Sequence, residues 1–257
     1  MTDDVFIMEV KIPHTEPKTP VIVALLLGTH TMKKGGEIPE SIHRVRLLNS
    51  AIFMKAEIAK SSYRTIEKHY SKYVNVLEDG RFAIRPLDFL PAMKEIDLLI
   101  FELGSILDFF AREINFAYKL GIKIKYISFG RLIHELRNHH TDLPITKYIL
   151  DFADSDTHSY FRKMRNMVTH RLPFRFKGSD TRLFFPDDPD SDEVYPTTDL
   201  MIDVCKTCKK WLYEILFFVD QTSIEIFLNM AELKVIGDET GTEFDFREHF
   251  KRDSPYS

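Results

Sequence analysis

The sequence has few cysteines, no secretory start and no long apolar run, and each absence excludes a class of protein. Two cysteines in 257 residues cannot build a disulfide scaffold and suit a reducing compartment. The first residues, Met1 to Asp4, are acidic and lack the basic start and apolar run of a signal peptide. The longest apolar stretches are short or are interrupted by carboxylates. These absences predict a cytoplasmic protein without a transmembrane segment.

The sequence also lacks the marks of several enzyme classes. It contains no Gly-rich phosphate loop and no evident Ser/His/Asp arrangement. Cys205 and Cys208 have redox or zinc spacing, but no second pair accompanies them, and within a helix they are expected to be small core residues. The net charge of −4 gives no attraction of the whole molecule to nucleic acid. Any nucleic-acid site must therefore be a local basic patch.

What the chain does have is long stretches in which apolar residues recur every three or four positions, as in amphipathic helices. The first stretch follows Pro39 and is broken at Asp79 and Gly80, and the second runs from Pro91 to Leu120. Further helices are expected at residues 131–139, 145–152, 155–171 and 198–230. A short strand is expected at residues 122–129, and residues 173–196 are expected to be irregular, with an exposed acidic loop at 187–193.

The order of these segments predicts a mainly α protein with three regions. Residues 1–40 are rich in Val and Ile and contain prolines, and they are expected to form an extended or β segment. Residues 41–232 carry the amphipathic helices, which favour an up-and-down helical bundle. Residues 233–257 are expected to form a polar C-terminal tail.

One segment has the opposite charge to the rest of the protein. From Thr157 to Ser179 there is no acidic residue, although the chain as a whole is acidic. The segment carries six positive side chains, which are Arg162, Lys163, Arg165, Arg171, Arg175 and Lys177. His170 lies among these cations. A histidine surrounded by arginines is expected where an anion is held and protons are moved.

Within this segment, Arg165 and His170 form an arginine–histidine pair with four residues between them. The same spacing occurs between Arg64 and His69, so the spacing by itself identifies no site. The pair at Arg165 differs because Asn166 follows the arginine directly. The pair at Arg165 also differs in its position on the helix. One side of this helix is apolar, and the motif lies on the other side. The apolar side is formed by Tyr160, Phe161, Met164, Met167 and Val168.

The two motif residues do not face the same direction on one helix. Asn166 and His170 are four residues apart and share a face, whereas Arg165 and His170 are about 140° apart around the axis. One helix therefore offers a broad polar surface and not a closed pocket. The simplest way to complete a site is the same helix of a second subunit across a twofold axis, which predicts a homodimer.

These residue types suit the cleavage of RNA through its 2′-hydroxyl. That reaction needs a base for the hydroxyl, an acid for the leaving oxygen and positive charge for the crowded phosphorane, and it requires no metal. His170 is the candidate acid or base, and Arg165 is the candidate phosphate clamp. Asn166 would orient the imidazole or bind phosphate. The candidate contacts to the RNA backbone are Arg162, Lys163, Arg171 and Arg175. The other interpretation is a solvated basic helix face without a catalytic role.

The sequence Arg-Asn-x-x-x-His late in an all-helical chain resembles the signature of HEPN domains, the prokaryotic and eukaryotic nucleotide-binding superfamily. The resemblance covers roughly residues 41–232. Many members are metal-independent ribonucleases that act as homodimers, often as toxins or antiviral effectors. The resemblance implies catalytic roles for Arg165 and His170, a polar supporting role for Asn166, RNA as the substrate, no cofactor, and an antitoxin or defence-system partner. Other members are inactive scaffolds or regulators, so a silent module that binds nucleic acid, nucleotide or protein is the alternative.

Two further groups of residues are candidates for a supporting role. Glu102 and Asp108 are carboxylates in an apolar helix; Asp108 is expected to pair with Arg112, and Glu102 to contact an arginine of the motif helix. The segment from His134 to His140 resembles a zinc-protease motif, but Asn138 stands where the second histidine is needed. A metal-dependent hydrolase built on this cluster is a third, weaker hypothesis. A surface cluster, or an extension of the polar site through His134, are the other interpretations.

Overall fold

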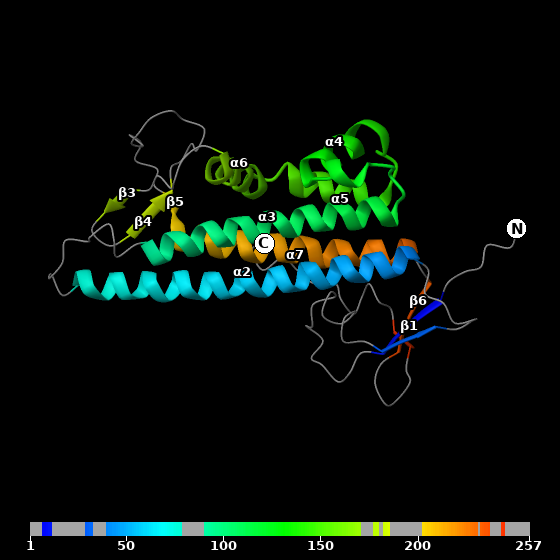
Figure 1. Ribbon diagram of the computed structural model, residues 1–257, viewed down its shortest axis with the longest axis horizontal. Helices are drawn as coiled ribbons and strands as arrows, with labels where there is room; N and C mark the ends of the chain where they lie inside the picture. Colours follow the sequence, from blue (N-terminus) through cyan, green and yellow to red (C-terminus); the bar gives the residue numbers. More distant parts are fainter. Residues whose placement is uncertain are drawn as a thin grey trace, which may run out of the picture. The chain divides into compact units, whose positions relative to one another are not determined.

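The computed structural model describes residues 7–11, 29–32, 40–78, 90–170, 177–179, 182–185, 202–230, 232–236 and 243–244. Side chains are described for residues 44–45, 47–69, 91–168, 203–223, 225 and 226. Most of the described residues are helical, in α2 (Glu40–Glu78), α3 (Leu90–Ala117), α4 (Phe129–His139), α5 (Pro144–Ala153), α6 (Asp156–His170) and α7 (Val204–Met230) (Figure 1). The predicted mainly α bundle is confirmed. No described helix is long and apolar enough to cross a membrane.

The strands in the described part of the chain form two small sheets. The first has the order β2-β1-β6-β7, built from β1 (Ile7–Lys11), β2 (Thr29–Met32), β6 (Glu232–Ile236) and β7 (Glu243–Phe244). β1 is parallel to β6, with Ile7 opposite Glu232 and Lys11 opposite Ile236. Residues 7–11 and 29–32 of the expected N-terminal segment are therefore strands. The strand β6 beside β1 comes from the part of the chain in which only a polar tail was expected. The second sheet contains β3 (Lys177–Ser179), β4 (Arg182–Phe185) and β5 (Ile202–Asp203).

Three local predictions were wrong. Residues 122–129 do not form a strand; they contain a short 3₁₀ turn, η2 (Ile124–Tyr126). The Asn115 side chain bonds both backbone groups of Ile122, so these groups do not need a neighbouring strand. The segment predicted to be irregular contains β3 and β4. The last helix begins at Val204 instead of residue 198, because Ile202 and Asp203 pair with β4 and Asp203 Oδ1 accepts a hydrogen bond from Lys206 N at 2.9 Å.

The chain divides into two compact units, which we describe separately. Unit 1 comprises Met1–Met54, Ile106–Ala153 and Leu216–Ser257, and unit 2 comprises Lys55–Ser105 and Asp154–Ile215. The core of unit 1 contains a cluster of aromatic rings. The Phe152 and Phe218 rings are stacked with centroids 4.0 Å apart, and Phe110 and Phe129 meet the Phe218 ring edge-on. These contacts join α3, α4, α5 and α7 within the unit.

Polar side chains in unit 1 hold two pairs of helices together. Asp108 Oδ1 accepts a hydrogen bond from Phe129 N at 3.0 Å and so holds the start of α4 against α3. The expected pair between Asp108 and Arg112 is not formed. Glu113 of α3 is completely buried and accepts a hydrogen bond from Asn49 Nδ2 of α2 at 2.9 Å. Burial raises the pKa of Glu113 to about 8, although the hydrogen bond from Asn49 opposes the shift.

The core of unit 2 is built around Trp211 of α7. Its indole meets the Phe161 ring edge-on at 5.5 Å and lies 5.7 Å from the Tyr160 ring. Cys208, one turn earlier in α7, is completely buried, and burial raises the pKa of its thiol. Burial is also the main cause of the raised pKa of the Cys205 thiol. A raised pKa keeps a thiol protonated and unreactive. The expected position in the core is confirmed for Cys208, whereas Cys205 is half-buried.

Candidate nucleic-acid site on helix α6

The motif lies on α6, which is anchored to unit 2 by its apolar face. Ser155 precedes the helix and its hydroxyl accepts a hydrogen bond from His158 N at 3.2 Å. Phe161, Met164 and Met167 are buried, at intervals of three residues, and Phe161 packs on Trp211. The predicted buried side of the motif helix is therefore confirmed. Because this side is held by the core, the opposite side of α6 has a fixed orientation within the unit.

The opposite side of α6 carries the candidate polar residues. Arg162 and Asn166 are exposed, whereas Lys163 and Arg165 are half-buried. Position 170 is the last residue of the helix, one turn beyond Asn166. The side chain of His170, and all of Arg171 and Arg175, lie outside the described residues. Since α6 is continuous from Asp156 to His170, positions 165 and 170 are about 140° apart around its axis, as predicted.

Arg165 lies against α3 at Gly104, a residue that the sequence did not single out. Cδ and Cζ of Arg165 are each 2.8 Å from the position that a Cβ at Gly104 would occupy, and Nε is closer still. An alanine at position 104 would therefore overlap the arginine side chain. The only signal of this contact in the sequence is a glycine in the middle of an apolar helix, where glycine costs about 1 kcal/mol relative to alanine.

Glu102, a candidate for a supporting role, has a different partner from the one expected. It is buried on α3 and forms an ion pair with Lys55 of α2, with Lys55 Nζ 2.8 Å from Glu102 Oε2. The expectation that it contacts an arginine of the motif helix was wrong. The same lysine lies over the exposed ring of Phe101, with Nζ 5.5 Å from the ring centroid. Lys55 thus neutralises a buried carboxylate next to the turn of α3 that contacts Arg165.

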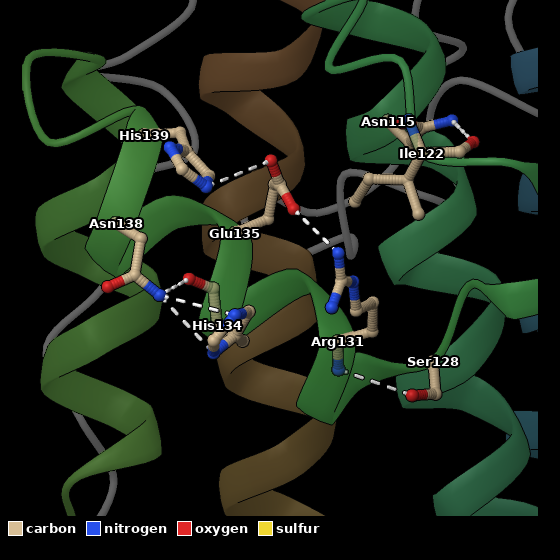
Figure 2. A network of polar contacts seen from close by, with 8 residues as sticks. All are labelled: Asn115, Ile122, Ser128, Arg131, His134, Glu135, Asn138 and His139. Carbon is tan, nitrogen blue, oxygen red and sulfur yellow. Dashed lines mark hydrogen bonds and ion pairs between the residues drawn. The ribbon is translucent and has the colours of Figure 1, made fainter.

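The histidine-rich segment lies on α4, in unit 1, and satisfies its polar groups locally (Figure 2). Glu135 lies between Arg131 and His139, one turn before and after it, at 3.3 and 3.9 Å. Asn138 Nδ2 donates to the backbone carbonyl of His134 at 2.8 Å. The interpretation as a surface cluster agrees with the exposure of His134 and His139. Across the residues that the structure describes, no group of three or more His, Cys, Asp or Glu side chains is placed to hold a metal.

Comparison with known proteins gives a family for this part of the chain. The family model described as HEPN_Cthe2314-like HEPN matches residues 96–208, a range that includes α4, α5 and α6 and contains Arg165, Asn166 and His170. This match agrees with the resemblance of the Arg165–His170 motif to HEPN domains and supports membership of the HEPN superfamily for residues 96–208. At the level of the family, the match supports a nuclease or nucleotide-binding module. No curated protein and no solved structure matches the chain.

Proposed function

We propose that this protein is a metal-independent endoribonuclease in which His170 is the general acid or base and Arg165 binds the scissile phosphate. The observation that carries the proposal is the placement of Arg165. It projects from a helix anchored through Trp211, it is half-buried against α3, and it belongs to the part of the chain that matches the HEPN family. A guanidinium held in this way keeps its donors directed without losing further side-chain freedom on binding.

The reaction follows from these groups. A neutral imidazole removes the proton of the 2′-hydroxyl, and the resulting oxygen attacks the adjacent phosphorus. The bond from phosphorus to the 5′-oxygen breaks, and an imidazolium supplies the proton that this oxygen needs. The products are a 2′,3′-cyclic phosphate and a 5′-hydroxyl. Arg165 neutralises the charge of the phosphorane, with Asn166 orienting the imidazole or the phosphate.

The proposed active form is a homodimer. The reaction needs both an acid and a base near one phosphate, and the helix separates positions 165 and 170 by about 140°. A second α6 related by a twofold axis would supply another arginine and another histidine to the same phosphate. Arg162, Lys163, Arg171 and Arg175 would then contact the RNA on either side of the scissile bond. A cytoplasmic location suits the free cysteines, and a toxin or defence role with an antitoxin partner follows from the family resemblance.

A silent interaction module is the second candidate function, and an exposed stripe on α2 favours it. Leu47 and Met54, both in unit 1, are exposed apolar side chains seven residues apart, so they lie on one side of that helix. Exposed apolar residues gathered in this way are typical of surfaces that bind another protein. Such a surface would serve a regulatory module as well as a dimeric enzyme.

The first experiment is cleavage of an end-labelled single-stranded RNA by the purified protein, with and without EDTA. We expect cleavage to continue undiminished in EDTA, because imidazole and guanidinium groups supply all the chemistry. The products should carry 2′,3′-cyclic phosphate ends. Cleavage that stops in EDTA and returns with a divalent metal would contradict the proposal and favour a metal-dependent hydrolase. No cleavage under either condition would favour the silent module.

A further inference from the structure

We infer that Gly104 is a positioning residue, whose missing side chain leaves the space in which the Arg165 guanidinium is held for catalysis. The inference rests on the proposed function, because Gly104 can position Arg165 for catalysis only if Arg165 binds the scissile phosphate. It concerns residues of unit 2 alone. Gly104 itself contacts no substrate; it acts through Arg165.

The geometry shows which part of Arg165 depends on Gly104. The atoms next to the absent Cβ are Cδ, Nε and Cζ, the three that set the direction in which the guanidinium points. A methyl group at position 104 would occupy their space, and α3 is a regular helix whose backbone cannot withdraw by itself. The flexible arginine side chain would move instead of the backbone. The expected consequence of an added methyl group is therefore a redirected guanidinium in an otherwise intact fold.

Other contacts fix the arginine backbone and the surface beneath it. Phe161, one turn before Arg165, is buried against Trp211, and Met164 next to it is completely buried, so α6 cannot shift to compensate. On α3, the buried Leu103 and the ion-paired Glu102 fix the turn that contains Gly104. With both helices held by these contacts, we expect the Arg165 side chain to move if a larger residue is placed at position 104.

Glycine at position 104 also lowers the stability of α3, and another contact must offset this loss. In the interior of α3, alanine would stabilise the helix by about 1 kcal/mol. Gly104 is buried, so solvent exposure gives no reason to avoid a side chain there. The close approach of Arg165 is the compensating contact. If Gly104 served only to let α3 and α6 pack closely, a small apolar residue at position 165 would be sufficient. The residue at this position is instead an arginine.

The test compares Gly104→Ala with Gly130→Ala. Gly130 lies in the first turn of α4, and a Cβ there would meet no atom within 4 Å, so it receives the same added methyl group without a neighbour. For RNA cleavage, we expect Gly104→Ala to lower kcat by about 100-fold with little change in KM, because the clamp is misplaced for the transition state. Gly130→Ala should cleave as the wild type does. A role in packing alone would leave kcat per folded molecule unchanged.

Thermal unfolding provides a second measurement that does not need activity. In an Arg165→Ala background, Gly104→Ala should raise the Tm by about 2–4 °C, because only the gain in helix propensity remains. In the wild-type background the same substitution should raise the Tm by less, or lower it, with a difference of at least about 2 °C between the backgrounds. Equal effects in both backgrounds, or a Gly104→Ala enzyme with wild-type kcat, would overturn the inference.

The two measurements separate the inference from the proposed function. If the wild-type protein cleaves no RNA but the two substitutions remain coupled in the Tm, the contact between Gly104 and Arg165 holds, and the ribonuclease assignment is wrong. If the wild type cleaves RNA and the substitutions are not coupled, the ribonuclease assignment stands and Gly104 has no positioning role.

Discussion

Replacement of His170 by alanine is expected to lower the rate of RNA cleavage by about 10²- to 10⁴-fold, the usual contribution of a general acid or base. If one imidazole removes the 2′-hydroxyl proton and the other protonates the leaving oxygen, the substitution removes both groups from a symmetric dimer. The effect would therefore lie near the upper end of this range. Affinity for RNA should change little, because the arginines remain. Single-turnover cleavage rates and a binding titration with a 2′-O-methylated RNA, which cannot be cleaved, measure the two quantities separately.

The chain contains a matched control for this substitution. His69 follows Arg64 on α2 with the same spacing as His170 follows Arg165, and no asparagine follows Arg64. His69→Ala should leave cleavage unchanged. An equal loss in both variants would show that the assay reports folding and not chemistry. A His170→Ala protein that folds and cleaves at the wild-type rate would remove His170 from the mechanism.

Replacement of Glu113 by glutamine is expected to abolish a large part of the dependence of stability on pH. Burial raises the pKa of Glu113 from its ordinary value of 4.5 to about 8 in the folded protein. Between these values the folded state binds more protons than the unfolded state, so stability falls as the pH rises. From pH 5 to pH 7 this group should cost the wild type about 3 kcal/mol of unfolding free energy. A glutamine cannot ionise, and the variant should lose none of that amount.

Urea unfolding at pH 5, 6 and 7 measures this effect directly. The Asn49 Nδ2 hydrogen bond to Glu113 Oε1 can be kept by the amide oxygen of glutamine, so the contact between α2 and α3 is preserved. Glu57→Gln is the control, since Glu57 is exposed and its ion pair with Lys60 is worth at most about 1 kcal/mol. When the free energy of unfolding is plotted against pH, the slopes for Glu113→Gln and Glu57→Gln should differ, and not only the absolute values. Parallel pH profiles for the wild type and Glu113→Gln would contradict a neutral buried Glu113.

Local periodicity was enough to predict the helices and the orientation of α6. The apolar positions of α2, α3 and α7 recur at helical spacing, and burial of Ile52, Leu99 and Ile215 agrees with it. On α6 the same rule placed Phe161 and Met164 inside and left Arg162 and Asn166 outside. These predictions succeed because burial of a helix face depends on residues within a few turns of one another. The motif and its spacing are likewise properties of one short segment.

Contacts between residues far apart in the sequence could not be predicted from local periodicity. Glu102 was expected to contact an arginine of the motif helix, but its partner is Lys55; Asp108 accepts from Phe129 N, not from Arg112. The strand expected at residues 122–129 is absent because Asn115 satisfies the backbone of Ile122. In each case several partners were chemically suitable. The choice among them depends on which atoms the packed helices bring together.

By itself, the sequence determined the helical class of this protein, the basic character of residues 157–179 and the polar side of α6 on which the motif lies. Only the tertiary structure decided that β1 pairs in parallel with β6, and that Arg165 lies over Gly104. Hydrophobic periodicity and motif spacing are fixed by neighbours along the chain. Strand partners and the space left by a missing side chain depend on residues far apart in sequence, and these meet only after the helices have packed.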